Sequence, residues 1–194
     1  MVILESLWRK HQYGVLVGFV HHLAYFRAAS RIYGEWGKKS EFWVRTIDAH
    51  LIRCVIDWCM VFGTDSNQIH WKKVVTSEIA QDEFRQVLCD FAGLPNTEWK
   101  AYWEKMIVFR NDFAAHRITA DVYPAVPYMD KALLVATTYD EWVRKQLQIS
   151  MNAIFDEPTL ADRYARIIRT IETPMRKLIG LGPIVKDEYE GNPP

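Results

Sequence analysis

Cysteine is scarce in this chain, and its few cysteines lack the spacing of a metal or disulfide site. The 194 residues include only Cys54, Cys59 and Cys89, and no two of them are arranged as Cys-x-x-Cys. An odd number of cysteines without such a pair argues against a disulfide framework and against a zinc knuckle. We therefore expect a protein of a reducing, cytoplasmic compartment that holds no metal ion.

The chain also has no excess of charge of either sign. Lys and Arg together number 24, as do Asp and Glu, so the formal net charge is zero. A neutral chain has no general basic field, and it can attract nucleic acid only through a local basic patch. Any RNA-binding function must therefore depend on a few particular residues.

Long apolar runs and cofactor motifs are missing as well. The apolar run from Tyr13 to Val20 stops at His21, well short of the ~18 to 20 residues that a membrane-spanning helix needs. The sequence contains no Gly-x-x-x-x-Gly-Lys-Ser/Thr loop for nucleotide phosphates and no Glu-x-x-His pair for a di-iron centre. We expect no membrane span and no cofactor.

The chain does have the composition and the periodicity of a packed helical protein. Hydrophobic residues make up 49% and charged residues 25%, close to globular averages. From Ile47 to Phe62 the apolar residues recur at steps of three and four, the spacing of one buried helical face. Such patterns predict helices over residues 4–36 (as one long or two short helices), 40–62, 77–92, 96 or 97 to 116, 130–155, and from 158 onward. The predicted fold is all-α, an antiparallel bundle of five or six helices.

The remaining segments complete this organisation. The segment Thr64–Thr76 carries turn-forming residues without a helical period and is predicted to be a structured loop. Two prolines make Tyr123–Met129 extended or turning. We expect one domain over residues 1–185, followed by a charged, disordered tail over 186–194.

The residues with the clearest chemical potential lie near the end of the predicted helix 96–116. On a wheel of ~100° per residue with Met106 at zero, Arg110 falls at about +40° and His116 at about −80°. Arg110 therefore lies within the apolar stripe and His116 at its margin. Since burying an arginine is costly unless it is paired or reaches water or phosphate, two interpretations stand. Arg110 is either a snorkelling or carboxylate-paired structural residue, or an anion-binding residue beside a histidine.

An arginine, a polar residue, and a histidine four to six positions after the arginine resemble the nuclease motif of the HEPN superfamily. Here the three are Arg110, Asn111 and His116. The segments WCMVFG (Trp58 to Gly63) and HWKK (His70 to Lys73) are similar to the HEPN branch associated with abortive infection against phage. The resemblance extends over roughly residues 40 to 117, and it implies a HEPN-like helical bundle.

This resemblance implies a metal-independent endoribonuclease of a toxin-antitoxin or phage-defence system, whose site forms where two copies of the motif meet in a homodimer. It makes His116 the general acid or base, Arg110 the phosphate clamp, and Asn111 the group that orients either one. These residue types suit the chemistry, because a histidine titrates near neutral pH and a guanidinium stabilises charge on a phosphate. Asp112, four residues before His116, is either a support for the imidazole or a solvated surface charge.

Further residues could bind RNA without taking part in the chemistry. His70, Trp71, Lys72 and Lys73 combine a ring that can stack on a base with cations for the phosphates, and Arg117 adds a cation next to the motif. The alternative is a capping loop whose Trp71 is tucked onto the bundle.

A second function also fits the sequence. A catalytically silent HEPN-like module could bind nucleic acid or a protein partner and keep Arg110 for an interface, and the zero net charge agrees with this. Some HEPN toxins are silenced by modification of a tyrosine two positions after the motif histidine, but here that position is Ile118. Any antitoxin or defence-system partner would therefore have to act in another way.

Overall fold

The structure is a computed structural model that describes residues 4–115 and 125–181. Its elements are α1 (Glu5–Leu7), η1 (Trp8–Gln12), α2 (Tyr13–Trp36), α3 (Glu41–Phe62), α4 (Trp71–Val74), α5 (Glu78–Ala92), α6 (Asn96–Phe109), η2 (Arg110–Ala115), α7 (Met129–Met151) and α8 (Leu160–Leu178). Both η segments are π-helices. Within these ranges six α-helices have 14 residues or more, and no β-strand occurs. The prediction of an all-α bundle of five or six helices is confirmed.

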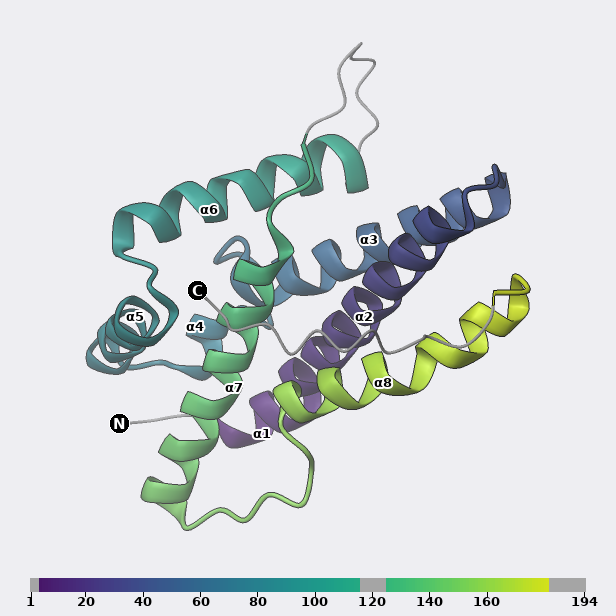
Figure 1. The fold of residues 1–194 in the computed structure, drawn as a ribbon. Helices are drawn as coiled ribbons and strands as arrows, with labels where there is room; N and C mark the ends of the chain where they lie inside the picture. The colour runs from purple at the N-terminus through teal and green to yellow at the C-terminus, as the bar shows by residue number, and fades with distance from the viewer. Residues whose placement is uncertain (1–3, 116–124, 182–194) are drawn as a thin grey trace.

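The helices α2, α3 and α8 form one side of the bundle (Figure 1). The short connection between α2 and α3 makes these two helices antiparallel neighbours that pack along their length, and α8 lies along another side of α2. The helices α5, α6 and α7 form the other side, where α5 packs against α7 and η2 packs against α3. The two sides are in contact: α2 also contacts α7, and α3 also contacts α6 and η2.

The first helical stretch is continuous from Glu5 to Trp36, with the π-helical segment η1 inserted. It ends where Gly37 adopts a left-handed conformation with φ +66° and donates its N–H to the Tyr33 carbonyl. Glycine is the residue that tolerates this conformation best, so the predicted end of the helix is the observed one.

Three predicted boundaries were wrong. The segment Thr64–Thr76 is not all loop, since it contains the one-turn helix α4. Helix α7 ends at Met151 and not at residue 155, because Asn152 takes a left-handed conformation with φ 52°. Helix α8 begins at Leu160, after Thr159, whose side chain accepts a hydrogen bond from the Asp162 N–H. A threonine cap is worth about 1 kcal/mol.

Large aromatic side chains from several helices make up the core. Trp58 of α3 is fully buried, and its indole N–H donates to the Ala132 carbonyl of α7 at 3.2 Å. Its ring stands edge-on to Tyr102 of α6. One side chain of α3 thus contacts both α6 and α7, which fixes how α6 lies on the bundle.

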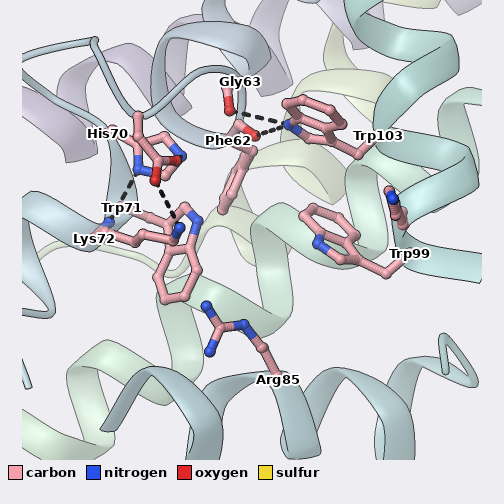
Figure 2. A pocket seen from close by; sticks show the side chains of 10 residues that line it. Phe62, Gly63, His70, Trp71, Lys72, Arg85, Trp99 and Trp103 are labelled. Carbon is pink, nitrogen blue, oxygen red and sulfur yellow. Dashed lines mark hydrogen bonds and ion pairs between the residues drawn. The ribbon is translucent and has the colours of Figure 1, made fainter. Parts of the chain in front are cut away.

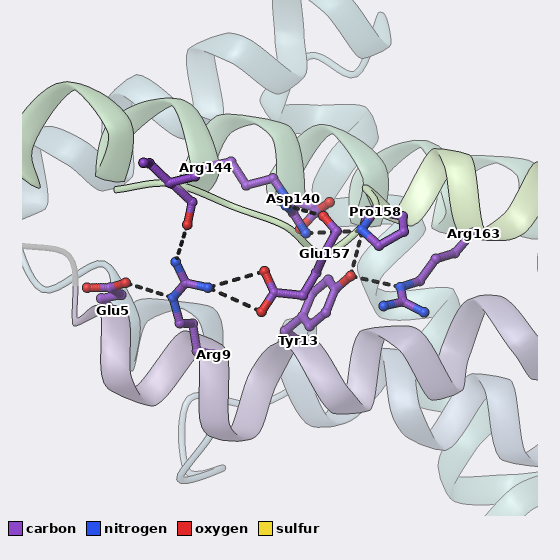
Figure 3. Close-up of polar contacts among 9 residues, drawn as sticks. Glu5, Arg9, Tyr13, Asp140, Arg144, Glu157, Pro158 and Arg163 are labelled. Atoms are coloured by element: carbon purple, nitrogen blue, oxygen red, sulfur yellow. Dashed lines mark hydrogen bonds and ion pairs between the residues drawn. The ribbon is translucent and has the colours of Figure 1, made fainter. Parts of the chain in front are cut away.

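A buried ion pair holds the connection between α7 and α8 (Figure 3). Arg144 Nε donates to Asp140 Oδ1 at 3.0 Å, and Asp140 Oδ2 accepts the Leu160 N–H at 2.9 Å. The other guanidinium nitrogens of Arg144 donate to the carbonyls of Glu157 and Pro158. Burial raises the pKa of Asp140, and the charge of Arg144 opposes that shift. Both charges are therefore compensated by groups that also tie the two helices together.

No helix in the described ranges is long and apolar enough to cross a membrane. The predicted tail, 186–194, lies outside the described residues, and the assignment of residues 1–185 to one domain stays a prediction.

Removing Arg144 should leave Asp140 as an uncompensated buried charge. We expect Arg144→Ala to lower the free energy of unfolding by about 3 to 5 kcal/mol. The neighbouring Lys145 is exposed, so Lys145→Ala should change it by less than about 0.5 kcal/mol. Urea denaturation followed by tryptophan fluorescence measures both. Equal stabilities of the two variants would show that the ion pair does not hold the connection.

Candidate functional site

The segment that carries the predicted motif is a π-helix. The α-helix α6 ends at Phe109, and from Arg110 to Ala115 the backbone is π-helical. Hydrogen bonds from residue i to i+5 put more residues in each turn than an α-helix has, and such segments are rare and often lie at functional sites. The motif therefore begins at the point where the helix changes type.

Arg110 lies at the edge of the core. Phe109 is buried, and its ring centroid is 5.0 Å from that of Phe113, four residues on. Arg110 itself is half-buried, and its Nε and Nη2 donate to the exposed amide oxygen of Asn111 at 3.0 and 2.7 Å. This partner is neutral, so the hydrogen bonds orient the guanidinium without cancelling its charge.

The α-helical wheel that placed Arg110 and His116 does not hold beyond Phe109, because the backbone from Arg110 to Ala115 is π-helical. The spacing of four residues that placed Asp112 beneath His116 belongs to an α-helix. Asp112 is half-buried within the π-helix η2. His116 and Arg117 lie outside the described residues, so their predicted roles stay predictions.

Asp57 of α3 is a carboxylate that could have paired with Arg110. It is fully buried, and Arg53 Nη2 lies 2.9 Å from its Oδ1. Burial raises the pKa of Asp57, and Arg53 opposes the shift. In the described part of the chain Arg110 forms no ion pair with a carboxylate. Burial raises the pKa of Cys59 to about 12, and the charge of Arg110 opposes this shift.

The four loop residues predicted to bind RNA have different environments. His70 and Trp71 are 1% and 5% exposed, Lys72 is half-buried and Lys73 is exposed. Trp71 packs edge-on against Phe84 with centroids 5.2 Å apart, which agrees with the alternative of a tryptophan tucked onto the bundle. Of this group, Lys73 is exposed, and Lys72 is half-buried and pairs with Asp65 at 2.7 Å.

His70 caps the short helix α4. Its Nδ1 accepts the Lys72 N–H at 3.4 Å, and its Nε2 lies 3.4 Å from Asp65 Oδ1. Since Nδ1 is the acceptor, the ring proton belongs on Nε2. Burial lowers the pKa of His70 to about 4, although Asp65 acts to raise it. His70 is therefore neutral near pH 7.

A cavity of about 280 Å³ opens beside this loop. We call it the aromatic pocket; it is lined by Phe62, Gly63, Asp65, His70, Trp71, Lys72, Arg85, Trp99, Lys100 and Trp103. Figure 2 shows Trp99 and Trp103 extending toward Phe62 and the loop, with Arg85 rising from α5 beneath Trp71. Three cationic side chains face one carboxylate in this wall, although the whole chain is neutral.

Trp103 and Gly63 fix the geometry of the pocket. The Trp103 indole N–H is shared between the carbonyls of Phe62 and Gly63, at 2.9 and 3.0 Å. A Cβ on Gly63 would lie 2.2 Å from the Cys59 carbonyl oxygen, so only glycine fits here.

The sequence did not predict this pocket. The spacing of Trp99 and Trp103 fits the apolar stripe of their helix, and no motif distinguishes Arg85 or Lys100 from other surface cations. The available signal was the spacing of two tryptophans by four residues with a lysine beside the first. That signal alone does not reveal a cavity, since the other walls come from α3, α5 and the loop.

The described residues contain no group of three or more His, Cys, Asp and Glu side chains placed to hold a metal ion. No model of a protein family matches the chain, and no curated protein or solved structure matches it either.

The lowered pKa of His70 predicts a pH-dependent stability. Unfolded His70 takes up a proton near pH 6.5, whereas the folded residue does so only near pH 4. Stability is therefore lost as the pH falls between these values, by about 2 kcal/mol at pH 5. His70→Asn keeps a capping side chain but cannot titrate, so the stability difference between wild type and variant should shrink by that amount from pH 7.5 to pH 5.

Urea denaturation at the two pH values measures this difference. His11 is exposed, and His11→Asn serves as the matched control. A difference for His70→Asn that stays constant with pH would contradict the buried, neutral imidazole.

Proposed function

We propose that the chain is a HEPN-like, metal-independent endoribonuclease of a toxin or phage-defence system, which cuts RNA as a homodimer through Arg110, Asn111 and His116. The proposal rests on the environment of the Arg110 guanidinium. It opens a π-helical segment, lies at the edge of the core, and is held by the neutral amide of Asn111. A guanidinium with this environment keeps its charge available for a phosphate.

The chemistry follows from two copies of the motif. One His116 takes the proton of a 2′-hydroxyl, whose oxygen attacks the adjacent phosphorus. The bond from phosphorus to the 5′-oxygen of the next nucleotide breaks, and the second His116 gives that oxygen a proton. Arg110 stabilises the charge that builds on the phosphate. The products are a 2′,3′-cyclic phosphate and a 5′-hydroxyl.

A homodimer would also explain why polar groups follow an apolar helix. A twofold interface brings the same residues of both copies together, and Arg110, Asn111 and Asp112 follow directly on the buried Phe109. Val108, one residue earlier, is 52% exposed although it is apolar. Contact between two copies of this segment would cover Val108 and place both arginines beside one cleft.

The second candidate is a catalytically silent HEPN-like module that binds nucleic acid or a protein partner. Two observations favour it: the zero net charge, and an aromatic pocket with cations that could bind a ligand without cutting it. In this alternative Arg110 serves an interface between proteins.

Cleavage of a mixed cellular RNA pool in EDTA distinguishes the two. We expect wild-type protein to cut RNA in the chelator, and His116→Ala to be about 10² to 10⁴ times slower because the proton transfer is lost. Arg110→Ala should be impaired as well. Arg169 on α8 is exposed, and Arg169→Ala should cut like wild type.

Circular dichroism and light scattering would establish that all four proteins have the same fold and oligomeric state. If wild type and His116→Ala are equally inactive on tRNA, rRNA and single-stranded RNA, the ribonuclease proposal fails and the silent module is favoured.

A further inference from the structure

The aromatic pocket has a rigid wall of ring surface. Trp99 and Trp103 are four residues apart on α6, so they share one face of the helix. Trp99 packs against Trp58 with centroids 6.0 Å apart, and the Trp103 indole is held by two carbonyl oxygens. Both rings are half-buried and line the cavity. Rings held in place in this way lose little conformational entropy when a ligand stacks on them.

Cations surround these rings. Lys72, Arg85 and Lys100 line the pocket, and Lys100 is exposed. Lys72 pairs with Asp65 at 2.7 Å, and Arg85 pairs with Asp82 outside the pocket. Both carboxylates are mostly exposed, and exposed ion pairs are weak, so an incoming phosphate can replace them. The pocket therefore suits a ligand that is both planar and anionic.

The size of the cavity limits that ligand. Its volume of about 280 Å³ lies just below the range of roughly 300 to 1,000 Å³ that is usual for small-molecule sites. The cavity can hold one planar ring system with a charged group at the mouth of the pocket, but it is too small for a stack of several rings. A purely apolar ligand would remove Lys72, Arg85 and Lys100 from water without offering them a hydrogen-bond partner, which is unfavourable.

We infer that the aromatic pocket binds one nucleoside phosphate, with the base against Trp99 and Trp103 and the phosphate near Lys72, Arg85 and Lys100. The same chemistry is offered by a free nucleotide and by one residue of an RNA strand. Arg110 lies seven residues beyond Trp103, roughly 10 Å along the helix. Binding in the pocket is separate from cleavage at Arg110 and His116, so either can hold without the other.

The test measures binding without cleavage. Isothermal titration calorimetry with AMP, GMP, CMP and UMP tests the free nucleotide. Fluorescence polarisation of a labelled 2′-O-methyl octanucleotide tests the strand, since its blocked 2′-oxygens cannot attack the phosphate. Both are done at about 50 mM salt, where phosphate contacts are strong.

The decisive variant is Lys100→Glu, because Lys100 is exposed and its substitution should not disturb the fold. Lys145 on α7 is also exposed but does not line the pocket, so Lys145→Glu is the matched control. We expect Lys100→Glu to weaken binding about tenfold or more and Lys145→Glu to change it by less than about twofold. Trp99→Leu, which removes the stacking surface, should weaken it by about tenfold as well.

Two outcomes support the inference and identify the source of the ligand. Saturable binding of a mononucleotide that Lys100→Glu weakens indicates a free nucleotide, and binding of the octanucleotide alone with the same sensitivity indicates a residue of a strand. Absence of binding to every probe, or equal affinities of Lys100→Glu and Lys145→Glu, would overturn it. Such a result would leave the ribonuclease proposal standing, because the cleavage experiment tests Arg110 and His116 separately.

Discussion

The turn that ends α3 at Gly63 positions both candidate sites of this protein. The chain passes so close to the Cys59 carbonyl that a side chain at residue 63 would collide with it. In this turn the carbonyls of Phe62 and Gly63 accept the Trp103 indole N–H. These hydrogen bonds hold α6 against the turn at Trp103. The position of the residues that follow α6, including Arg110, therefore depends on this contact.

The two sites use one helix in different ways. At Trp103 the α-helix presents rigid rings and a neighbouring lysine to a cavity. At Arg110 the backbone becomes π-helical and an arginine is held beside a neutral amide at the edge of the core. In the functions proposed above, the first arrangement binds a base and a phosphate, and the second stabilises charge during cleavage. In that proposal a neutral protein concentrates positive charge where it contacts an RNA strand.

Periodicity predicted α3 and α5 well, because their apolar faces repeat over four or more turns and Gly63 and Gly93 end them. It could not predict α4, whose four residues are too few to show a period. Nor could it predict η2, since six residues do not distinguish an α-helical from a π-helical pattern. The aromatic pocket escaped prediction because Trp71, Arg85 and Trp99 meet only after three separate segments have packed.

The proposed ribonuclease requires the motif segments of two copies to meet across a twofold axis. Asn111 is exposed and would lie near its own copy there, so Asn111→Cys in a Cys89→Ser background should form an intermolecular disulfide under mild oxidation. Ser150→Cys, at an exposed site of α7, should not. Non-reducing gel electrophoresis separates the cross-linked dimer from the monomer. We expect a dimer band for Asn111→Cys alone, and an Asn111→Cys protein that stays monomeric would contradict the proposed homodimer.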